Sequence, residues 1–219
     1  MNLPTPVVYV VDDDSAVRSS LEALFRSVGI RSRSYASPTE LLAELTPDAV
    51  GCLVLDVRLP RMSGLELQSR LATKGIRIPI IVITGHADVP TAVRAMHQGA
   101  VDFIEKPFNE QRLLEQVHAA IESDIQRRLR QREAEELRLR LKTLTERERQ
   151  VLRQVVRGES SKAIAKNLRI SPKTVDVHRA RIMEKLHSRS TADLIRIVYQ
   201  ANQAFGSSVL ASLAGSRLG

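Results

Sequence analysis

The feature that most constrains the fold is a regular alternation of short apolar runs and helix-patterned segments in the first half of the chain. The apolar runs, of strand length, lie at 7–11, 31–35, 51–56, 78–84 and 101–105. Segments whose apolar residues have helical spacing separate them, at 15–28, 38–45, 64–73 and 89–98. This alternation predicts an α/β architecture, a five-stranded, parallel, doubly wound sheet with helices on both faces.

Polar residues stand at the ends of four of these runs. Asp12 and Asp13 follow the first run, Asp56 ends the third, Thr84 ends the fourth and Lys106 follows the fifth. The carboxyl ends of the strands in an open parallel sheet line one crevice, so we expect these side chains to converge. Each has a structural explanation when taken alone, but their shared position favours a site for a divalent cation and a phosphoryl group.

The residue types suggest a division of labour in this crevice. A carboxylate attacks phosphorus poorly unless a cation neutralises the repulsion between the two anions, and carboxylate oxygens are suitable ligands for a hard cation. We expect Asp12 and Asp13 to bind the cation and Asp56 to be the nucleophile that forms an acyl phosphate. Lys106 and Thr84 would then contact phosphoryl oxygens. The Lys106–Pro107 bond is a candidate cis peptide.

Charge separates the two halves of the chain. Residues 1–124 hold 12 Lys and Arg against 16 Asp and Glu, whereas residues 125–219 hold 21 against 9. A basic half joined to a mildly acidic half predicts that only the second half meets a polyanion. A basic surface without a partner is the alternative.

The second half is helical throughout. A long, highly charged segment at 109–141 precedes four short helical segments at 145–157, 161–168, 171–186 and 191–199. We therefore predict a first domain at 1–124, a helical linker at 125–143, an all-α domain at 144–204 and a tail at 205–219. We favour a solvated spacer over a coiled-coil seam for the linker, because its apolar pattern breaks at 132–136.

The joint at Ile170 and Ser171 predicts a helix-turn-helix, in which the second helix enters the major groove of DNA. Ser171 is a suitable N-cap, and Pro172 suits the first turn. The polar residues of this second helix are Lys173, Asp176, His178, Arg179, Arg181 and Lys185.

Other features narrow the class of protein. Cys52 is the only cysteine and lies in an apolar run, so we expect a buried thiol and no disulfide framework. No apolar run approaches membrane length, and the first residues lack the features of a signal peptide. We expect a cytoplasmic protein without a membrane partner.

The motifs of the first half resemble those of a two-component response-regulator receiver domain, especially of the FixJ-like group, whose fold is flavodoxin-like. The motifs are VVDDD (10–14), LDVRLPRMSGLEL (55–67) and VITGHADVPTAVRAMHQGAVDFIEKPF (82–108). The resemblance implies that a sensor histidine kinase phosphorylates Asp56. The implied ligands of Mg²⁺ (or Mn²⁺) are Asp12, Asp13, Asp56 and the backbone carbonyl of Arg58. It also implies that Thr84 and Phe103 switch, creating a homodimer surface on the fourth helix, fifth strand and fifth helix.

The segment LTERERQVLRQVVRGESSKAIAKNLRISPKTVDVHRARIMEKLHSRSTADLI (144–195) is similar to a LuxR-type DNA-binding domain. The similarity implies a recognition helix at Pro172–Lys185 with base-facing Asp176, Val177 and Ala180. It places Lys173, Thr174, Arg179 and Arg181 nearer the phosphates. Asp176 would accept a hydrogen bond from a cytosine amino group or only orient Arg179 or Lys173, and both options stay open. The role of His178 is open, whereas Glu148 is better explained as a structural acid.

These observations favour a transcription factor, not an enzyme, in which phosphorylation of Asp56 controls dimerisation and DNA binding; RNA polymerase is left open as a further partner. The first alternative is a DNA-binding regulator that a protein partner controls without phosphorylation. The second is an aspartate-nucleophile phosphatase. Such enzymes carry a second acid two residues after the nucleophile, where this chain has Arg58.

Overall fold

The computed structural model describes residues 4–85 and 88–205, which form two compact units. The first unit ends at Arg128 and the second begins at Leu129. Across these described ranges, no helix combines the length and the apolar character needed to cross a membrane.

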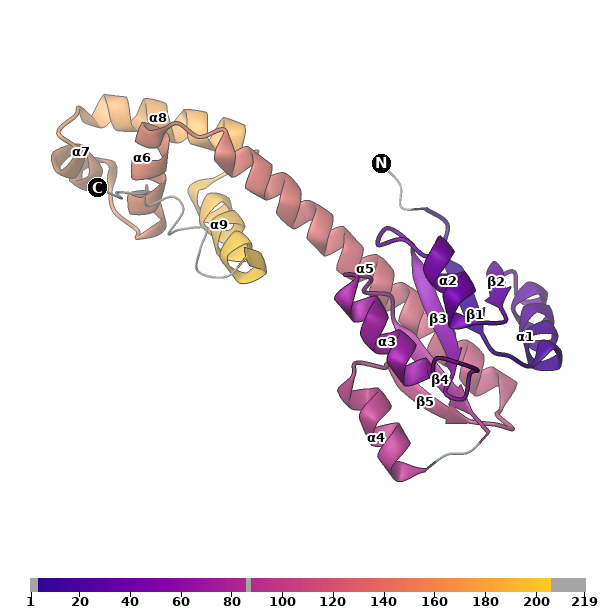
Figure 1. Cartoon of the computed structure of the whole chain (residues 1–219). Coiled ribbons are helices and arrows are strands. Elements are labelled where there is room, and N and C mark those ends of the chain that lie inside the picture. Colours follow the sequence, from indigo (N-terminus) through magenta and orange to yellow (C-terminus); the bar gives the residue numbers. More distant parts are fainter. Residues whose placement is uncertain (1–3, 86–87, 206–219) are drawn as a thin grey trace. The chain divides into compact units, whose positions relative to one another are not determined.

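The first unit is built on a parallel sheet whose five described strands have the order β2-β1-β3-β4-β5 (Figure 1). The strands are β1 (Val7–Val11), β2 (Ser32–Tyr35), β3 (Gly51–Asp56), β4 (Ile80–Thr84) and β5 (Asp102–Glu105). All neighbouring pairs are parallel, so their carboxyl ends lie along one edge. Every residue of β3 is buried, as expected for a strand covered on both faces. The predicted doubly wound α/β fold is confirmed.

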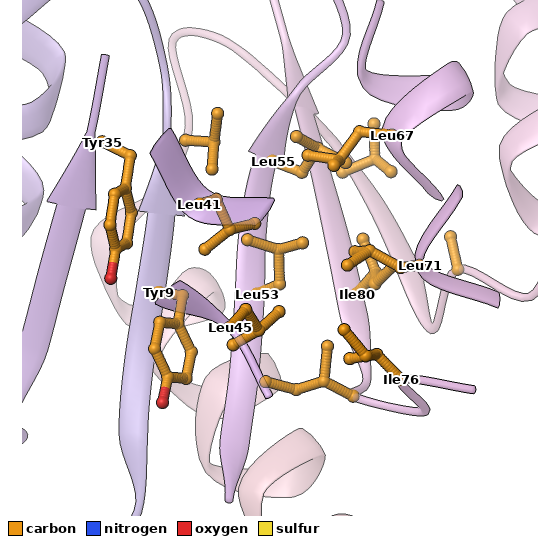
Figure 2. Packing of buried hydrophobic residues seen from close by; sticks show 14 of the residues in the cluster. Tyr9, Tyr35, Leu41, Leu45, Leu53, Leu55, Leu67, Leu71, Ile76 and Ile80 are labelled. Carbon is orange, nitrogen blue, oxygen red and sulfur yellow. The ribbon is translucent and has the colours of Figure 1, made fainter. Parts of the chain in front are cut away.

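Helices cover both faces of the sheet. They are α1 (Ser15–Ser27), α2 (Pro38–Glu44), α3 (Gly64–Thr73), α4 (Val89–His97) and α5 (Glu110–Lys142). On one face, Leu41 of α2 and Leu67 of α3 pack with Leu53 of β3 in an apolar core (Figure 2). On the opposite face, Phe25 of α1 and Leu113 of α5 belong to a second core. The sheet therefore lies between two apolar layers.

Local sequence signals mark where these helices begin and end. Ser37 caps α2 by accepting a hydrogen bond from the backbone N–H of Glu40, and Pro38 is the first residue of the helix. Asp14 caps α1, accepting from the N–H of Ala16 at 2.8 Å. Gly29 follows the end of α1 with a φ of 74°, in the left-handed region that glycine adopts without strain.

The second unit packs short helices around a core of its own. Its helices after α5 are α6 (Glu146–Val156), α7 (Ser161–Leu168), α8 (Pro172–Lys185) and α9 (Thr191–Phe205). Each contributes a fully buried residue to this core, namely Leu152, Ile164, Ile182 and Val198. Arg169 ends α7 in the left-handed conformation, with a φ of 54°, and Ser171 caps α8. The predicted helix-turn-helix is confirmed.

The structure divides the chain at a different place from the predicted boundary at 124. The first unit extends to Arg128, because side chains of α5 up to that residue bond to loops of the sheet. The predicted linker at 125–143 is shared, since Leu141 is buried in the core of the second unit. Helix α9 extends past the predicted end at 199 because Ala201 is also buried in that core. Residues 206–219, most of the predicted tail, lie outside the described part.

We predict that Leu53→Ala lowers the free energy of unfolding of the first unit by about 2–5 kcal/mol, because it leaves a cavity in a core where Leu53 has no exposed surface. Urea denaturation followed by hydrogen exchange would resolve the two units. The second unit should unfold as in the parent chain, since its core is separate. The control is Val28→Ala, at a side chain that is 45% exposed. An equal loss in both variants would contradict the assigned packing.

Candidate functional site

The crevice at the carboxyl edge of the sheet brings together the side chains that strand position predicts. Asp12 follows β1, Asp56 ends β3 and Lys106 follows β5. The ammonium nitrogen Nζ of Lys106 donates to Oδ2 of Asp12 at 2.5 Å and to Oδ1 of Asp56 at 2.8 Å. Both carboxylates are almost fully buried, with 1% and 5% of their surface exposed. A single cation therefore joins residues from three strands.

The remaining predicted residues frame this bridge. Thr84, the last residue of β4, is buried, and its carbonyl accepts the backbone N–H of Lys106 at 2.7 Å. The backbone N–H of Arg58 donates to Oδ2 of Asp56 at 2.5 Å. The side chain of Asp13 is exposed beside the crevice. The predicted cis bond between Lys106 and Pro107 is confirmed.

Two residues that the sequence reasoning missed hold the backbone of this site. The guanidinium of Arg18 on α1 donates to the carbonyls of Asp12 and Asp13 at 2.7 and 3.0 Å. Gly64 begins α3 directly against the backbone of Asp56, where a Cβ would lie 2.2 Å from the carbonyl oxygen. No sequence signal indicates the role of Arg18, whereas the glycine after Ser63 could have suggested a close approach.

Burial and the Lys106 bridge act in opposite directions on the ionisation of Asp56. Burial raises the pKa of the Asp56 carboxyl above its ordinary value, and the hydrogen bond and charge of Lys106 oppose this rise. Burial also lowers the pKa of Lys106, but its hydrogen bonds with Asp12 and Asp56 outweigh burial, so this pKa is raised overall. The ammonium is therefore stabilised as a cation between two carboxylates.

The donor set of the crevice fits a hard divalent cation. Carboxylate and carbonyl oxygens are the ligands that Mg²⁺ takes, and it commonly uses one or two carboxylates and completes its shell with water and phosphate. Asp12, Asp13 and Asp56 provide carboxylates within this edge of the sheet. Among the described residues, no three acidic, histidine or cysteine side chains are already grouped as a metal site. Lys106 contributes the positive charge in the present arrangement.

The candidate DNA-facing residues lie on α8, where most of them are exposed. Lys173, Thr174, Asp176, Val177, Ala180 and Arg181 are exposed, whereas His178, Arg179 and Lys185 are half-buried. Val177 has 45% of its surface exposed, so an apolar side chain is accessible on this helix. The exposed set thus contains both cationic groups and small apolar groups, which suits phosphate contacts and base contacts respectively.

Three of these helix residues already have side-chain partners on neighbouring helices. Ser161 of α7 donates to Asp176 at 2.8 Å, and Arg179 donates to Ser161 at 3.3 Å and to Thr191 of α9 at 2.8 Å. Lys185 instead donates to the carboxylate of Glu148 at 2.7 Å. These contacts connect α8 to its neighbouring helices, and residue type alone did not reveal them.

Glu148 has the structural role that the sequence predicts. It is 2% exposed and forms a reciprocal capping box with Thr145 at the start of α6. Burial raises its pKa, but hydrogen bonds from Lys185 and Thr145 outweigh this, so the pKa of Glu148 is lowered overall. Lys185 also donates to the carbonyl of Thr143 at 3.1 Å. This contact holds the end of α8 against the start of α6.

Comparison with protein families agrees with both halves of this description. Residues 8–118 match the response regulator receiver domain, and residues 142–198 match the bacterial regulatory proteins of the luxR family. The chain belongs to the response regulator family. The regulator is 48% identical to nodulation protein W of Bradyrhizobium diazoefficiens over 191 residues, which cover 87% of this chain and 84% of that protein. It is 46% identical to the transcriptional regulatory protein FixJ of Rhizobium meliloti, with 87% and 93% covered.

Solved structures give the same result for the fold. The response regulator StyR matches with a TM-score of 0.83 and 43% identity, covering 90% of this chain and all of that one. Full-length FixJ from B. japonicum matches with a TM-score of 0.55 and 38% identity, covering 90% and 98%. The predicted family and flavodoxin-like receiver are confirmed. The protein is a transcriptional response regulator of a two-component system, with a receiver domain and a LuxR-type DNA-binding domain.

We predict that Asp56→Asn makes the receiver of this regulator more stable than the parent chain near neutral pH. A carboxyl with a raised pKa binds its proton more tightly in the folded state, so the folded state loses stability as the pH rises from the ordinary Asp range through that raised pKa. The asparagine variant lacks this loss, and Lys106 stays protonated throughout this range. The advantage of the variant should therefore disappear on acidification.

Urea denaturation at several values between pH 4 and pH 7, an acidic window chosen around the ordinary carboxyl range, measures this difference. Asp48→Asn, at an exposed carboxylate of the same domain, is the control. A difference between Asp56→Asn and the parent chain that grows on acidification would contradict the sign of the shift.

Proposed function

We propose that Asp56 is the phosphoacceptor of this response regulator and that its phosphorylation by a sensor histidine kinase switches dimerisation and DNA binding. The observation that carries this proposal is the pairing of the buried Asp56 carboxylate with Lys106, at 2.8 Å, in the crevice of a receiver domain. The family supports a DNA partner and a kinase partner. Binding to DNA supports action in the cytoplasm, where RNA polymerase would be a further partner.

The proposed reaction transfers a phosphoryl group to a carboxylate oxygen of Asp56. A bond forms from that oxygen to phosphorus, while the bond from phosphorus to the donor nitrogen of the kinase histidine breaks and its electron pair stays on that nitrogen. The ammonium of Lys106 pairs with a phosphoryl oxygen, and the hydroxyl of Thr84 donates to another. Asp12, Asp13, Asp56 and the carbonyl of Arg58 would hold Mg²⁺ (or Mn²⁺), which neutralises the charge that develops on the phosphoryl oxygens.

The switch would act through Thr84 and Phe103. Phe103 lies on β5 and is half-buried against the core that Figure 2 shows. A rotation of its ring would therefore change the surface of the protein next to β5. The neighbouring helix α4 exposes Val89, Val93 and Met96, with 77%, 47% and 47% of their surfaces accessible. These apolar side chains support the α4–β5–α5 face as the homodimer surface of the phosphorylated form.

For DNA, we propose that α8 is the recognition helix. Asp176, Val177 and Ala180 would face bases, and Lys173, Thr174, Arg179 and Arg181 would lie nearer phosphates. The hydrogen bond from Ser161 supports a positioning role for Asp176, while its exposed carboxylate keeps the cytosine option open. His178 and Lys185 complete the proposed set, although the bond between Lys185 and Glu148 favours a structural role for this lysine.

We predict that acetyl phosphate with Mg²⁺ phosphorylates the parent chain and that Asp56→Asn abolishes this labelling, because the amide is not a nucleophile for phosphorus. Intact-mass spectrometry at neutral pH measures the added phosphoryl group. Asp48→Asn, at an exposed carboxylate of the same domain, is the matched control and should be labelled like the parent chain. Labelling that persists in Asp56→Asn would place the phosphoacceptor elsewhere. Phosphorylation without any change in DNA affinity would favour control by a protein partner.

We predict that Arg181→Gln weakens binding to all DNA sequences alike, since a phosphate contact carries no base information. The plot of the logarithm of the binding constant against the logarithm of salt concentration should become less steep by about one unit. Fluorescence anisotropy over a salt series, with specific and unrelated duplexes, measures both effects. Arg196→Gln on α9 removes the same charge away from α8 and serves as the control. A change in base preference would instead assign Arg181 to base recognition.

A further inference from the structure

A buried ionic cluster lies on α5 at the end of the receiver sheet opposite the phosphorylation crevice. The side chain of Asp124 has no exposed surface, and its carboxylate pairs with the guanidinium groups of Arg127 and Arg128, one turn later on the same helix. Arg128 Nε donates to Oδ2 of Asp124 at 2.8 Å, and the backbone N–H of Gly51 donates to the same oxygen at 3.1 Å. The proposed reaction uses none of these residues.

The two arginines extend this cluster to the loops that lead into the sheet. Arg127 donates to the carbonyl of Arg77 at 2.8 Å, in the segment that precedes β4. Arg128 donates to the carbonyls of Pro47 and Ala49, in the segment that precedes β3. Arg128 is only 12% exposed despite its charge. Side chains of α5 at 124–128 are therefore hydrogen-bonded to backbone groups near the start of β3 and β4.

Those two strands are the ones that carry the proposed reaction and its switch. β3 begins at Gly51, inside the cluster, and ends at Asp56. β4 follows the Arg77 loop and ends at Thr84. Gly51 also lies tightly against β1, because its φ is 137° and a Cβ there would be 1.9 Å from the carbonyl oxygen of Val7. A displacement of either strand along its axis would have to move or break a bond to α5.

The residues of α5 that follow the cluster have few apolar side chains, so the helicity of this segment depends on the helix before it. Residues 129–136 are dominated by Arg, Glu and Gln, and Leu129 is already 39% exposed. Such a segment gains little from packing, and starting a helix costs much more than extending one. α5 already begins at Glu110 and packs on the sheet through Leu113 and Val117, so the Asp124 cluster is its last attachment in the first unit and the following residues extend the helix from there.

We propose that Asp124, Arg127 and Arg128 form a coupling clamp, which links the positions of β3 and β4 to the helicity of α5 beyond Arg128. The clamp is a positioning device, since none of its residues contacts the reacting groups. Its part in signalling rests on the proposed phosphorylation of Asp56, but its effect on the helix does not. Loss of the clamp should leave phosphorylation intact and uncouple it from DNA binding.

The test compares Asp124→Asn with Glu122→Gln in the full chain. Glu122 is an exposed carboxylate on the same helix, so its variant makes the same chemical change outside the clamp. Three quantities are measured, namely labelling by acetyl phosphate, the ratio of DNA affinities with and without phosphorylation, and amide hydrogen exchange of residues 124–136. For Asp124→Asn we expect parental labelling, a ratio reduced by about fivefold or more, and faster exchange in that segment. Glu122→Gln should match the parent chain in all three.

The results separate the clamp from the phosphorylation switch. Parental exchange and a parental affinity ratio in Asp124→Asn would overturn the clamp, as would equal changes in Glu122→Gln. A parent chain that is labelled without any change in DNA affinity would contradict the proposed function, while the exchange measurement still decides the clamp. If Asp124→Asn does not fold, Arg128→Lys keeps the charge but loses the fork that reaches both loop carbonyls. It should then give the same pattern in weaker form, and parental behaviour of that variant would overturn the proposal.

Discussion

The first unit of this regulator depends on one ammonium group placed between two buried carboxylates. Asp12 and Asp56 stand at the ends of adjacent strands, so the parallel sheet brings two negative charges together where water is largely excluded. Such an arrangement is costly unless a cation compensates for it. Lys106 provides that cation from β5, and its backbone is held in turn by the carbonyl of Thr84 on β4. One ammonium thus compensates part of the negative charge that the two carboxylates bring into the crevice.

The same physical solution recurs at two other places in the chain. Asp124 has no exposed surface and is paired with two arginines, and Glu148 is 2% exposed and is paired with Lys185. Removing one partner of such a pair leaves an uncompensated buried charge, which costs more than the intact pair contributes. Each pair therefore helps to hold one element of the fold in position. In order along the chain, these elements are the crevice, the part of α5 at 124–128 and the end of α8.

Sequence reasoning succeeded where spacing and chemistry are linked by a geometric rule. The runs that end at Asp56 and Thr84 predicted the crevice, because parallel strands must present their carboxyl ends at one edge. It was less successful with contacts between helices. No sequence signal indicated the contacts of Arg18 and Ser161. Lys185 was predicted to face DNA, and in the structure it donates a hydrogen bond to Glu148. Whether a charged residue on a helix faces solvent or a neighbouring helix depends on how the helices pack, which local sequence does not specify.

The sequence by itself determined the order of the elements, the two kinds of domain and the polar residues that meet in the crevice at the carboxyl edge of the sheet. These follow from local periodicity, capping residues and strand ends, all of which are read over short stretches of chain. The tertiary structure alone decided which cation meets which carboxylate and where the first unit ends. Asp124 and Gly51 are far apart in the sequence and meet only because α5 packs back along the sheet. Pairings of that kind depend on the packing of whole elements, and no short stretch of sequence contains that information.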